Sequence, residues 1–105
     1  MLIRRANARD ADAIARHAAA AAAEEGVISV LDADRIRAHA FSQNPLFEAW
    51  VAQDKNNAPL TGHAMFTKSY DVRRACPNIV LNELYVVPEQ RRTGLARKLM
   101  SAVAR

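Results

Sequence analysis

Glycine and cysteine are scarce in this chain of 105 residues, and each shortage excludes a class of fold or site. The three glycines, Gly26, Gly62 and Gly94, are too few and too widely spaced for the glycine-rich fingerprint of a dinucleotide-binding loop or for a Walker A loop. The single cysteine, Cys76, cannot form an internal disulfide. This cysteine usage fits a reduced compartment such as the cytoplasm.

Long apolar runs are missing as well. No stretch approaches the roughly eighteen apolar residues that a membrane-spanning helix needs, and the N-terminal sequence MLIRRANARD lacks the apolar core of a signal peptide. Half of the residues are nonetheless apolar, which is enough to bury one core. We therefore expect a single domain over residues 1–105, located in the cytoplasm and without a membrane partner.

The formal net charge is +4, which favours a polyanionic partner such as nucleic acid or a phosphorylated cofactor. The basic residues are scattered in small clusters, two of which lie at positions 91–92 and 97–98. No contiguous basic stripe and no zinc-finger, helix-turn-helix or RNA-recognition signature accompanies them, so nucleic-acid binding stays a minor alternative. His17 and His39 have no partner at metal-ligand spacing, and we expect no metal site.

Hydrophobic periodicity and capping residues predict three helices and four strands. Asn7, with Asp10 three residues later, and Asp32 are good helix N-caps. The expected order is strand, helix, helix, strand, strand, strand, helix, over residues 1–5, 8–25, 33–41, 46–53, 60–70, 79–87 and from 94 onward. The polar stretch 71–78, which includes Cys76, is expected to be a loop. This order indicates an α/β fold with a mixed, mainly antiparallel sheet flanked by helices.

We expect the rest of the chain to be organised around residues 81–105, LNELYVVPEQRRTGLARKLMSAVAR. An apolar strand ends at Pro88, a basic loop follows, and Leu95, Leu99 and Val103 then recur at helical spacing. A strand that enters a helix through such a loop directs unpaired backbone N–H groups and the positive end of the helix dipole toward one point. Such a point attracts phosphate.

The stretch VPEQRRTGLA, residues 87–96, resembles the acetyl-coenzyme A signature of the GNAT family of N-acetyltransferases. That loop is written Gln/Arg, any, any, Gly, any, Gly/Ala, and its six positions are filled by Arg91, Arg92, Thr93, Gly94, Leu95 and Ala96. The similarity extends over most of the chain. Residues 44–47, 51–52 and 62–66, together with Tyr70, are most similar to the diamine (spermidine/spermine-type) acetyltransferase branch.

The resemblance implies acetyl-coenzyme A as cosubstrate. Backbone N–H groups at the helix start would bind the pyrophosphate, nearby arginines would add positive charge, and the strand before the loop, which in this family splays at a bulge, would offer its backbone to the pantetheine arm. The cofactor-binding residues implied in this way are Leu84, Tyr85, Val86, Arg91, Arg92, Thr93, Gly94, Leu95, Ala96 and Arg97.

Acetyl transfer to an amine requires a group that makes the amine neutral, usually a carboxylate acting as general base. Glu83, together with Asn82, is the catalytic candidate, because the resemblance aligns these two positions with acidic residues of the diamine branch. Asn82 departs from the glutamate of that branch and leaves Glu83 as the acidic candidate of this strand, with an ordinary strand charge as the alternative. His63 is a weaker base candidate, and we expect a structural or surface role for it.

Relatives in this family continue past the last predicted helix with further strands and another helix. The resemblance therefore implies a domain whose C-terminal part is missing from residues 1–105, with an apolar sheet edge left exposed. We expect self-association, as a homodimer or a larger assembly, to cover that edge. The expected function is transfer of acetyl to a primary amine of a small molecule. A catalytically dead half-domain that binds acetyl-coenzyme A or pairs with another chain is the alternative, before a basic nucleic-acid-binding module.

Overall fold

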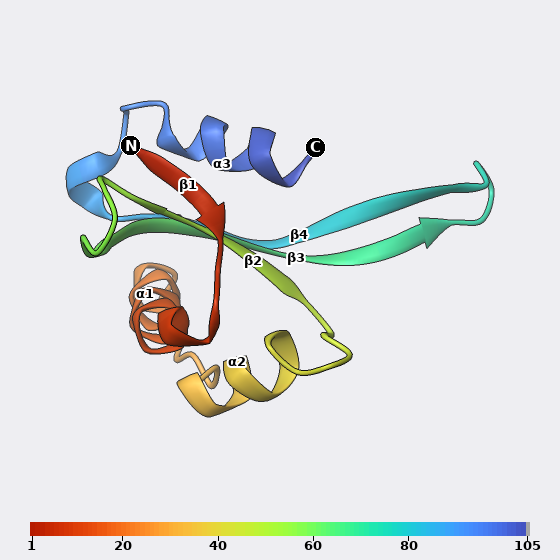
Figure 1. Cartoon of the computed structure of the whole chain (residues 1–105), viewed down its shortest axis with the longest axis horizontal. Coiled ribbons are helices and arrows are strands. Elements are labelled where there is room, and N and C mark those ends of the chain that lie inside the picture. Colours follow the sequence, from red (N-terminus) through yellow and green to blue (C-terminus); the bar gives the residue numbers. More distant parts are fainter. Residues whose placement is uncertain (105) are drawn as a thin grey trace.

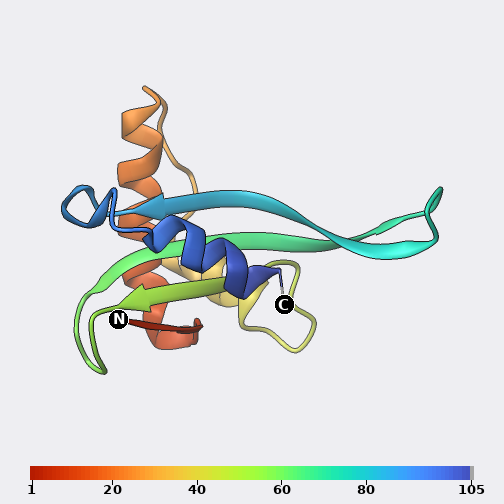
Figure 2. The ribbon, with the colours of Figure 1, turned by 90° about the horizontal axis from the view of Figure 1, so that it is seen from above.

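A four-stranded antiparallel sheet in the order β1-β2-β3-β4 forms the centre of the structure. The computed structural model describes residues 1–104. The strands are β1 (Leu2–Arg5), β2 (Glu48–Gln53), β3 (Leu60–Asp71) and β4 (Cys76–Val86), and the α-helices are α1 (Ala11–Glu24), α2 (Ala33–Ala40) and α3 (Leu95–Val103). Helices α1 and α2 cover one face of the sheet and α3 covers the other, as Figures 1 and 2 show. The predicted fold class and element order are confirmed.

The predicted helix caps are also confirmed. Asn7 opens a 3-10 turn (Ala8–Asp10) that leads into α1, where its side chain accepts from the Arg9 N–H (3.0 Å) while Asp10 accepts from the Asn7 N–H (2.8 Å). This reciprocal arrangement satisfies two N–H groups that a helix start leaves free. Asp32 accepts from the Arg35 N–H (2.8 Å) and fixes the start of α2.

Each face of the sheet carries its own apolar core, because alternate residues of a strand point to opposite faces. The core beneath α1 and α2 consists mainly of Ala11, Ile14, Ala18, Ile36, Ala40, Ala49, Val51, Leu60 and Met65. The core beneath α3 consists of Ala52, Ala64, Phe66, Val86, Leu95, Leu99 and Val103. Strand β2 contributes to both cores, as expected for a strand that is buried on both sides.

The predicted loop over residues 71–78 is wrong. Asp71 still belongs to β3 and pairs with Cys76 of β4, so the turn between the strands spans only residues 72–75. Pro77 lies inside β4, opposite Tyr70. A proline is tolerated there because β4 is an edge strand of the described sheet, whose outer side needs no N–H donor. The result is a long two-stranded ribbon that extends away from the helices (Figures 1 and 2).

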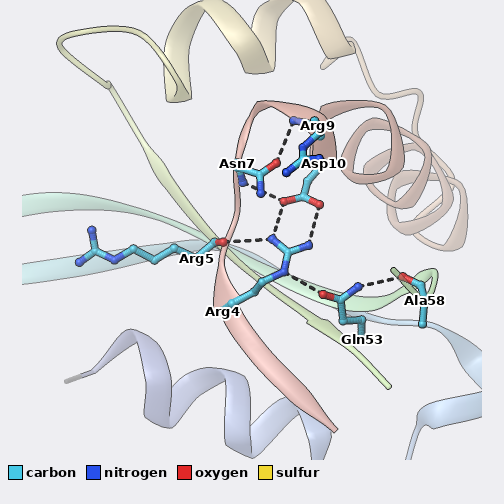
Figure 3. A network of polar contacts seen from close by, with 7 residues as sticks. All are labelled: Arg4, Arg5, Asn7, Arg9, Asp10, Gln53 and Ala58. Atoms are coloured by element: carbon cyan, nitrogen blue, oxygen red, sulfur yellow. Dashed lines mark hydrogen bonds and ion pairs between the residues drawn. The ribbon is translucent and has the colours of Figure 1, made fainter. Parts of the chain in front are cut away.

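A polar network joins β1, the start of α1 and the β2–β3 turn (Figure 3). The Arg4 guanidinium donates to both carboxylate oxygens of Asp10 (2.8 and 3.0 Å) and to Gln53 Oε1 (2.8 Å). Gln53 in turn donates to the Ala58 carbonyl (2.8 Å). The Asp10 side chain is only 9% exposed. Burial raises the pKa of Asp10, but hydrogen bonds from Arg4 and the Asn7 N–H, with the charge of Arg4, outweigh it and lower that pKa overall.

Gly62 lies where β3, β4 and α3 pack closely against one another. A Cβ at this position would lie 2.7 Å from the Tyr85 carbonyl oxygen and 3.3 Å from Leu99 Cδ1. Only a residue without a side chain therefore allows β3, β4 and α3 to pack as they do.

No helix within residues 1–104 is both long enough and apolar enough to cross a bilayer.

We predict that Gly62→Ala destabilises the fold by about 1–3 kcal/mol, because the added methyl group overpacks a site closed by backbone. Urea denaturation at pH 7 measures the change in the free energy of unfolding. Gly26→Asn is the control, since a Cβ at Gly26 meets no atom within 4 Å and asparagine tolerates its φ of +75°. Equal stability of Gly62→Ala and wild type would contradict the close approach.

We predict that Asp10→Asn lowers stability at pH 7 by about 1–3 kcal/mol, since it removes the anionic acceptor of a charged hydrogen-bond pair. The pKa of Asp10 is lower in the folded state, so the carboxylate stabilises the fold above its unfolded-state pKa, and this contribution is lost as the pH falls through the folded-state pKa. Wild type should therefore lose more stability than the variant below about pH 4. Urea denaturation across this range measures the difference. Exposed Asp34→Asn is the control, and identical acid dependence of Asp10→Asn and wild type would refute the argument.

Candidate functional site

The loop between β4 and α3 forms one end of the candidate site. Pro88–Gln90 form a 3-10 turn, and Thr93 Oγ1 donates to the Gln90 carbonyl (2.6 Å). Arg92 (φ +67°) and Gly94 (φ +85°) both adopt the left-handed backbone conformation. These two reversals turn the chain sharply before α3 begins. The predicted order of strand, basic loop and helix is confirmed.

The start of α3 presents free N–H groups. The first hydrogen bond of the helix runs from the Lys98 N–H to the Gly94 carbonyl (3.1 Å), so the N–H groups of Leu95, Ala96 and Arg97 have no acceptor within the helix. The Leu95 side chain is buried in the core beneath α3, which anchors these N–H groups from behind. A Cβ at Gly94 would meet no protein atom within 4 Å. The arrangement suits an anion that approaches the helix from solvent.

Basic side chains surround this helix start. Arg92, Arg97 and Lys98 are exposed, and none of them takes part in an ion pair within the described part of the chain. Their charges add to the positive end of the α3 dipole. The loop is therefore electropositive on its solvent side.

Arg91 bonds back to the rest of the protein, although its side chain stays partly exposed to solvent. Its Nε donates to the Val86 carbonyl (2.9 Å), and its Nη2 donates to both carboxylate oxygens of Glu24 at the end of α1 (2.8 and 2.7 Å). The guanidinium also lies 5.6 Å from the centre of the Tyr85 ring. The hydrogen bonds to Glu24 raise the pKa of Arg91 above its usual value. Arg91 thus contributes to the site by bracing the loop against α1 and β4.

The outer edge of β4 carries free backbone groups. The Tyr85 carbonyl is turned toward β3, since it would lie 2.7 Å from a Cβ on Gly62. Because successive residues of a strand direct their backbone groups to opposite sides, those of Leu84 and Val86 are turned outward, where no strand of residues 1–104 pairs with them. The Val86 carbonyl is occupied by Arg91. Leu84 therefore offers both its N–H and its carbonyl at this edge.

A β-bulge places the two catalytic candidates on the same face. Met65 pairs with Glu83, whereas the next residue, Phe66, pairs with Leu81, so Asn82 is an extra residue in β4. Asn82 and Glu83 both line two hollows on the side of α1 and α2. Without the bulge, neighbouring residues of the strand would point to opposite faces. The bulge is what brings Asn82 and Glu83 together.

The two hollows differ in their charge. The first, of about 360 Å³, lies between β4 and the end of α1 and is lined by the carboxylates of Glu25 and Glu83, without any lysine or arginine. The second, of about 340 Å³, is largely apolar and is lined by Leu31, Leu46, Phe47, Met65, Thr67, Asn82 and Glu83. Glu83 is shared by both hollows. On a chain of net charge +4, the first hollow is a local acidic site.

The side chain that Glu83 contacts is His63. His63 is fully buried, and its Nε2 lies 2.5 Å from Glu83 Oε1. Its ring packs against those of Tyr85 (centroids 5.9 Å apart) and His17 (6.1 Å). Burial, the nearby His63 and Arg16 lower the pKa of His17. The structural role that the sequence suggested for His63 includes a direct contact with the catalytic candidate.

Sequence reasoning missed three of these features: the pairing of His63 with Glu83, the second carboxylate of Glu25, and the bond of Arg91 to Glu24. The first could have been suspected from a histidine at an inward-facing position of a strand, since such a group needs a partner. The others depend on where α1 ends relative to β4, for which the sequence holds no signal. Within residues 1–104 no three His, Cys, Asp or Glu side chains lie close enough together to hold a metal ion.

Comparison with known sequences gives one family. Residues 18–105 match the sequence model described as the acetyltransferase (GNAT) family. No significant match was found among proteins with curated descriptions.

Comparison with solved structures gives the same fold. A protein from Clostridium difficile 630, described as a possible acetyltransferase, matches with a TM-score of 0.81 at 23% identity over 98% of this chain and 68% of its own. The ribosomal-protein-alanine N-acetyltransferase from Brucella melitensis biovar Abortus 2308 matches with a TM-score of 0.75 at 22% identity over 98% of this chain and 69% of its own. An integron cassette protein from the mobile metagenome of Cole Harbour Salt Marsh matches with a TM-score of 0.81 at 17% identity, over 97% and 66%. The chain thus spans about two thirds of the length of these structures.

Proposed function

The chain belongs to the acetyltransferase (GNAT) family, and from this premise we propose that it transfers the acetyl group of acetyl-coenzyme A to a primary amine of a small molecule. The observation that carries the proposal is the position of an acidic hollow and of a helix start with free N–H groups at the two ends of one short stretch that begins in β4. An anionic cosubstrate and a cationic acceptor would each be attracted to its own end.

The coenzyme A end of the site is the loop and the outer edge of β4. The free N–H groups of Leu95, Ala96 and Arg97 suit the pyrophosphate, and the exposed charges of Arg92 and Arg97 add to the attraction. The outward backbone groups of Leu84 suit the amides of the pantetheine arm. This arm would then run along β4 from the loop toward Glu83.

The amine end is the hollow lined by Glu25 and Glu83. Two carboxylates without a basic neighbour in the lining favour a bound ammonium group. The similarity to the diamine branch suggests an acceptor with a second ammonium, for which Glu25 supplies the second carboxylate. Asn82, which replaces the glutamate of that branch, would serve as a neutral hydrogen-bond donor and acceptor beside the amine.

The proposed reaction needs one proton acceptor. The Glu83 carboxylate takes a proton from the bound ammonium, and the neutral amine nitrogen then attacks the thioester carbonyl carbon. The C–S bond breaks as the carbonyl re-forms, the sulfur leaves as a thiolate that takes up the second proton given up by the attacking nitrogen, and the products are the acetylated amine and coenzyme A. Glu83 afterwards returns its proton to solvent, with which it is in contact because it is 28% exposed.

A binding-only role is the competing function. Such a protein would bind coenzyme A at the loop and would not turn over any amine.

We further propose that copies of the chain associate. This proposal fits the free edge of β4 and the exposed apolar residues of the ribbon, among them Tyr70, Val72 and Ile79.

We predict that wild type binds acetyl-coenzyme A and that Gly94→Ala weakens binding by about tenfold or more. A Cβ is strained at a φ of +85°, so the loop must rearrange and turn its N–H groups away from the phosphate. Calorimetric titration measures the affinity. Asn57→Ala is the matched control, because Asn57 also has a positive φ (+68°) but lies in the turn between β2 and β3. Unchanged affinity in Gly94→Ala would refute the loop assignment.

We predict that Glu83→Gln lowers kcat by about a hundred- to ten-thousandfold, the usual contribution of a general base, while affinity for acetyl-coenzyme A is unchanged. Release of free thiol is measured with a panel of diamines, amino acids and aminoglycosides. Glu89→Gln, an exposed carboxylate in the loop, is the control and should retain activity. Binding of acetyl-coenzyme A without turnover of any amine by wild type would instead support the binding-only role.

A further inference from the structure

We propose that His63 is a positioning residue that fixes Glu83 for proton transfer, an inference that rests on the function proposed above. His63 Nε2 and Glu83 Oε1 lie within hydrogen-bonding distance (2.5 Å), so the two groups share one hydrogen bond. The bond occupies one carboxylate oxygen. The other oxygen, Oε2, remains for the ammonium group of the acceptor.

The surroundings of the ring determine which nitrogen carries the proton. His63 Nδ1 is buried and has no hydrogen-bond partner among the described residues. A doubly protonated ring would leave a buried N–H without an acceptor, and a proton on Nδ1 alone would turn the Nε2 lone pair toward the carboxylate. The neutral ring with its proton on Nε2 avoids both penalties. His63 is therefore a fixed donor to an ionised Glu83.

The His63 ring is held in place by its neighbours. It is fully buried, and the rings of His17 on α1 and Tyr85 on β4 pack against it with centroids 6.1 and 5.9 Å away. Tyr85 is in turn covered by the Arg91 guanidinium. A ring packed in this way cannot rotate without disturbing α1 and β4. It can therefore pass its fixed orientation on to Glu83.

Glu83 needs such a support. Its side chain has three rotatable bonds and stands at the border of two hollows, so a free carboxylate could turn toward either of them. A displacement of about 1 Å of a catalytic group can cost about a hundredfold in rate. A buried apolar residue at position 63 would fill the same space but would leave the carboxylate unfixed.

The decisive comparison is His63→Gln with His63→Leu. Glutamine can still donate an N–H to Glu83, whereas leucine cannot. We expect His63→Leu to lower kcat by about ten- to hundredfold with an unchanged KM for acetyl-coenzyme A, and His63→Gln to retain activity within about threefold of wild type. His39→Leu, an exposed histidine on α2, is the control and should behave as wild type. Wild-type kcat in folded His63→Leu, or equal loss in both variants, would overturn the proposal.

A second measurement depends neither on the His63 variants nor on turnover. In wild type with 15N-labelled histidine, NMR should show His63 at neutral pH with a proton on Nε2 and none on Nδ1. In Glu83→Gln the Nε2 proton should lose the strong downfield shift that a carboxylate partner causes. A His63 protonated on Nδ1, or a spectrum that Glu83→Gln leaves unchanged, would refute the pairing. Absence of acetyl transfer by wild type would refute only the proposed function, because the NMR result tests the pair by itself.

Discussion

The pairing of β3 with β4, interrupted by one extra residue at Asn82, is the constraint on which the rest of the site depends. Before the bulge, residues 76–81 of β4 pair with β3 and form the ribbon that extends away from the helices. After the bulge, the side chain of Glu83 faces α1, while the backbone groups of Leu84 face the open edge of the sheet. One strand thus offers a carboxylate on its face and peptide groups along its edge within two residues. In a regular strand Asn82 and Glu83, as neighbours, would point to opposite faces of the sheet.

The charge distribution follows from the same strand. The chain is basic overall, and the exposed arginines and lysine near the start of α3 are free to attract anions. Two carboxylates, those of Glu25 and Glu83, nevertheless line the hollow between β4 and the end of α1. Opposite charges at the two ends of one short strand segment suit a reaction that joins an anionic cosubstrate to a cationic acceptor. Net charge alone does not distinguish nucleic acid from a phosphorylated cofactor, and the local arrangement of charges is the more informative quantity.

Local signals in the sequence predicted much of the fold. Asn7, Asp32 and Gly94 act within a few residues of themselves, and the helix starts and the tight loop that they predict are all present. The start of β4 was missed because Pro77 is disfavoured in strands generally, and its tolerance depends on β4 being an edge strand. The contact of His63 with Glu83 was missed for a similar reason. An inward-facing histidine indicates that a partner exists, but the identity of that partner depends on a register and a bulge between two strands, which no local pattern reveals.

Arg91 shows how the two ends of the site are joined. As the first residue of the signature loop it could have served as a further phosphate ligand, but its guanidinium is bound to Glu24 and to the Val86 carbonyl. Glu24 is the last residue of α1, and the next residue, Glu25, lines the acidic hollow. The end of α1 is therefore bonded to the loop and also forms one wall of the hollow. Arg91 also covers Tyr85, and Tyr85 packs against His63. One continuous set of contacts therefore joins the loop, the hollow and the histidine that supports Glu83. The position of α1 is therefore what ties the loop before α3 to the carboxylate that would accept the proton.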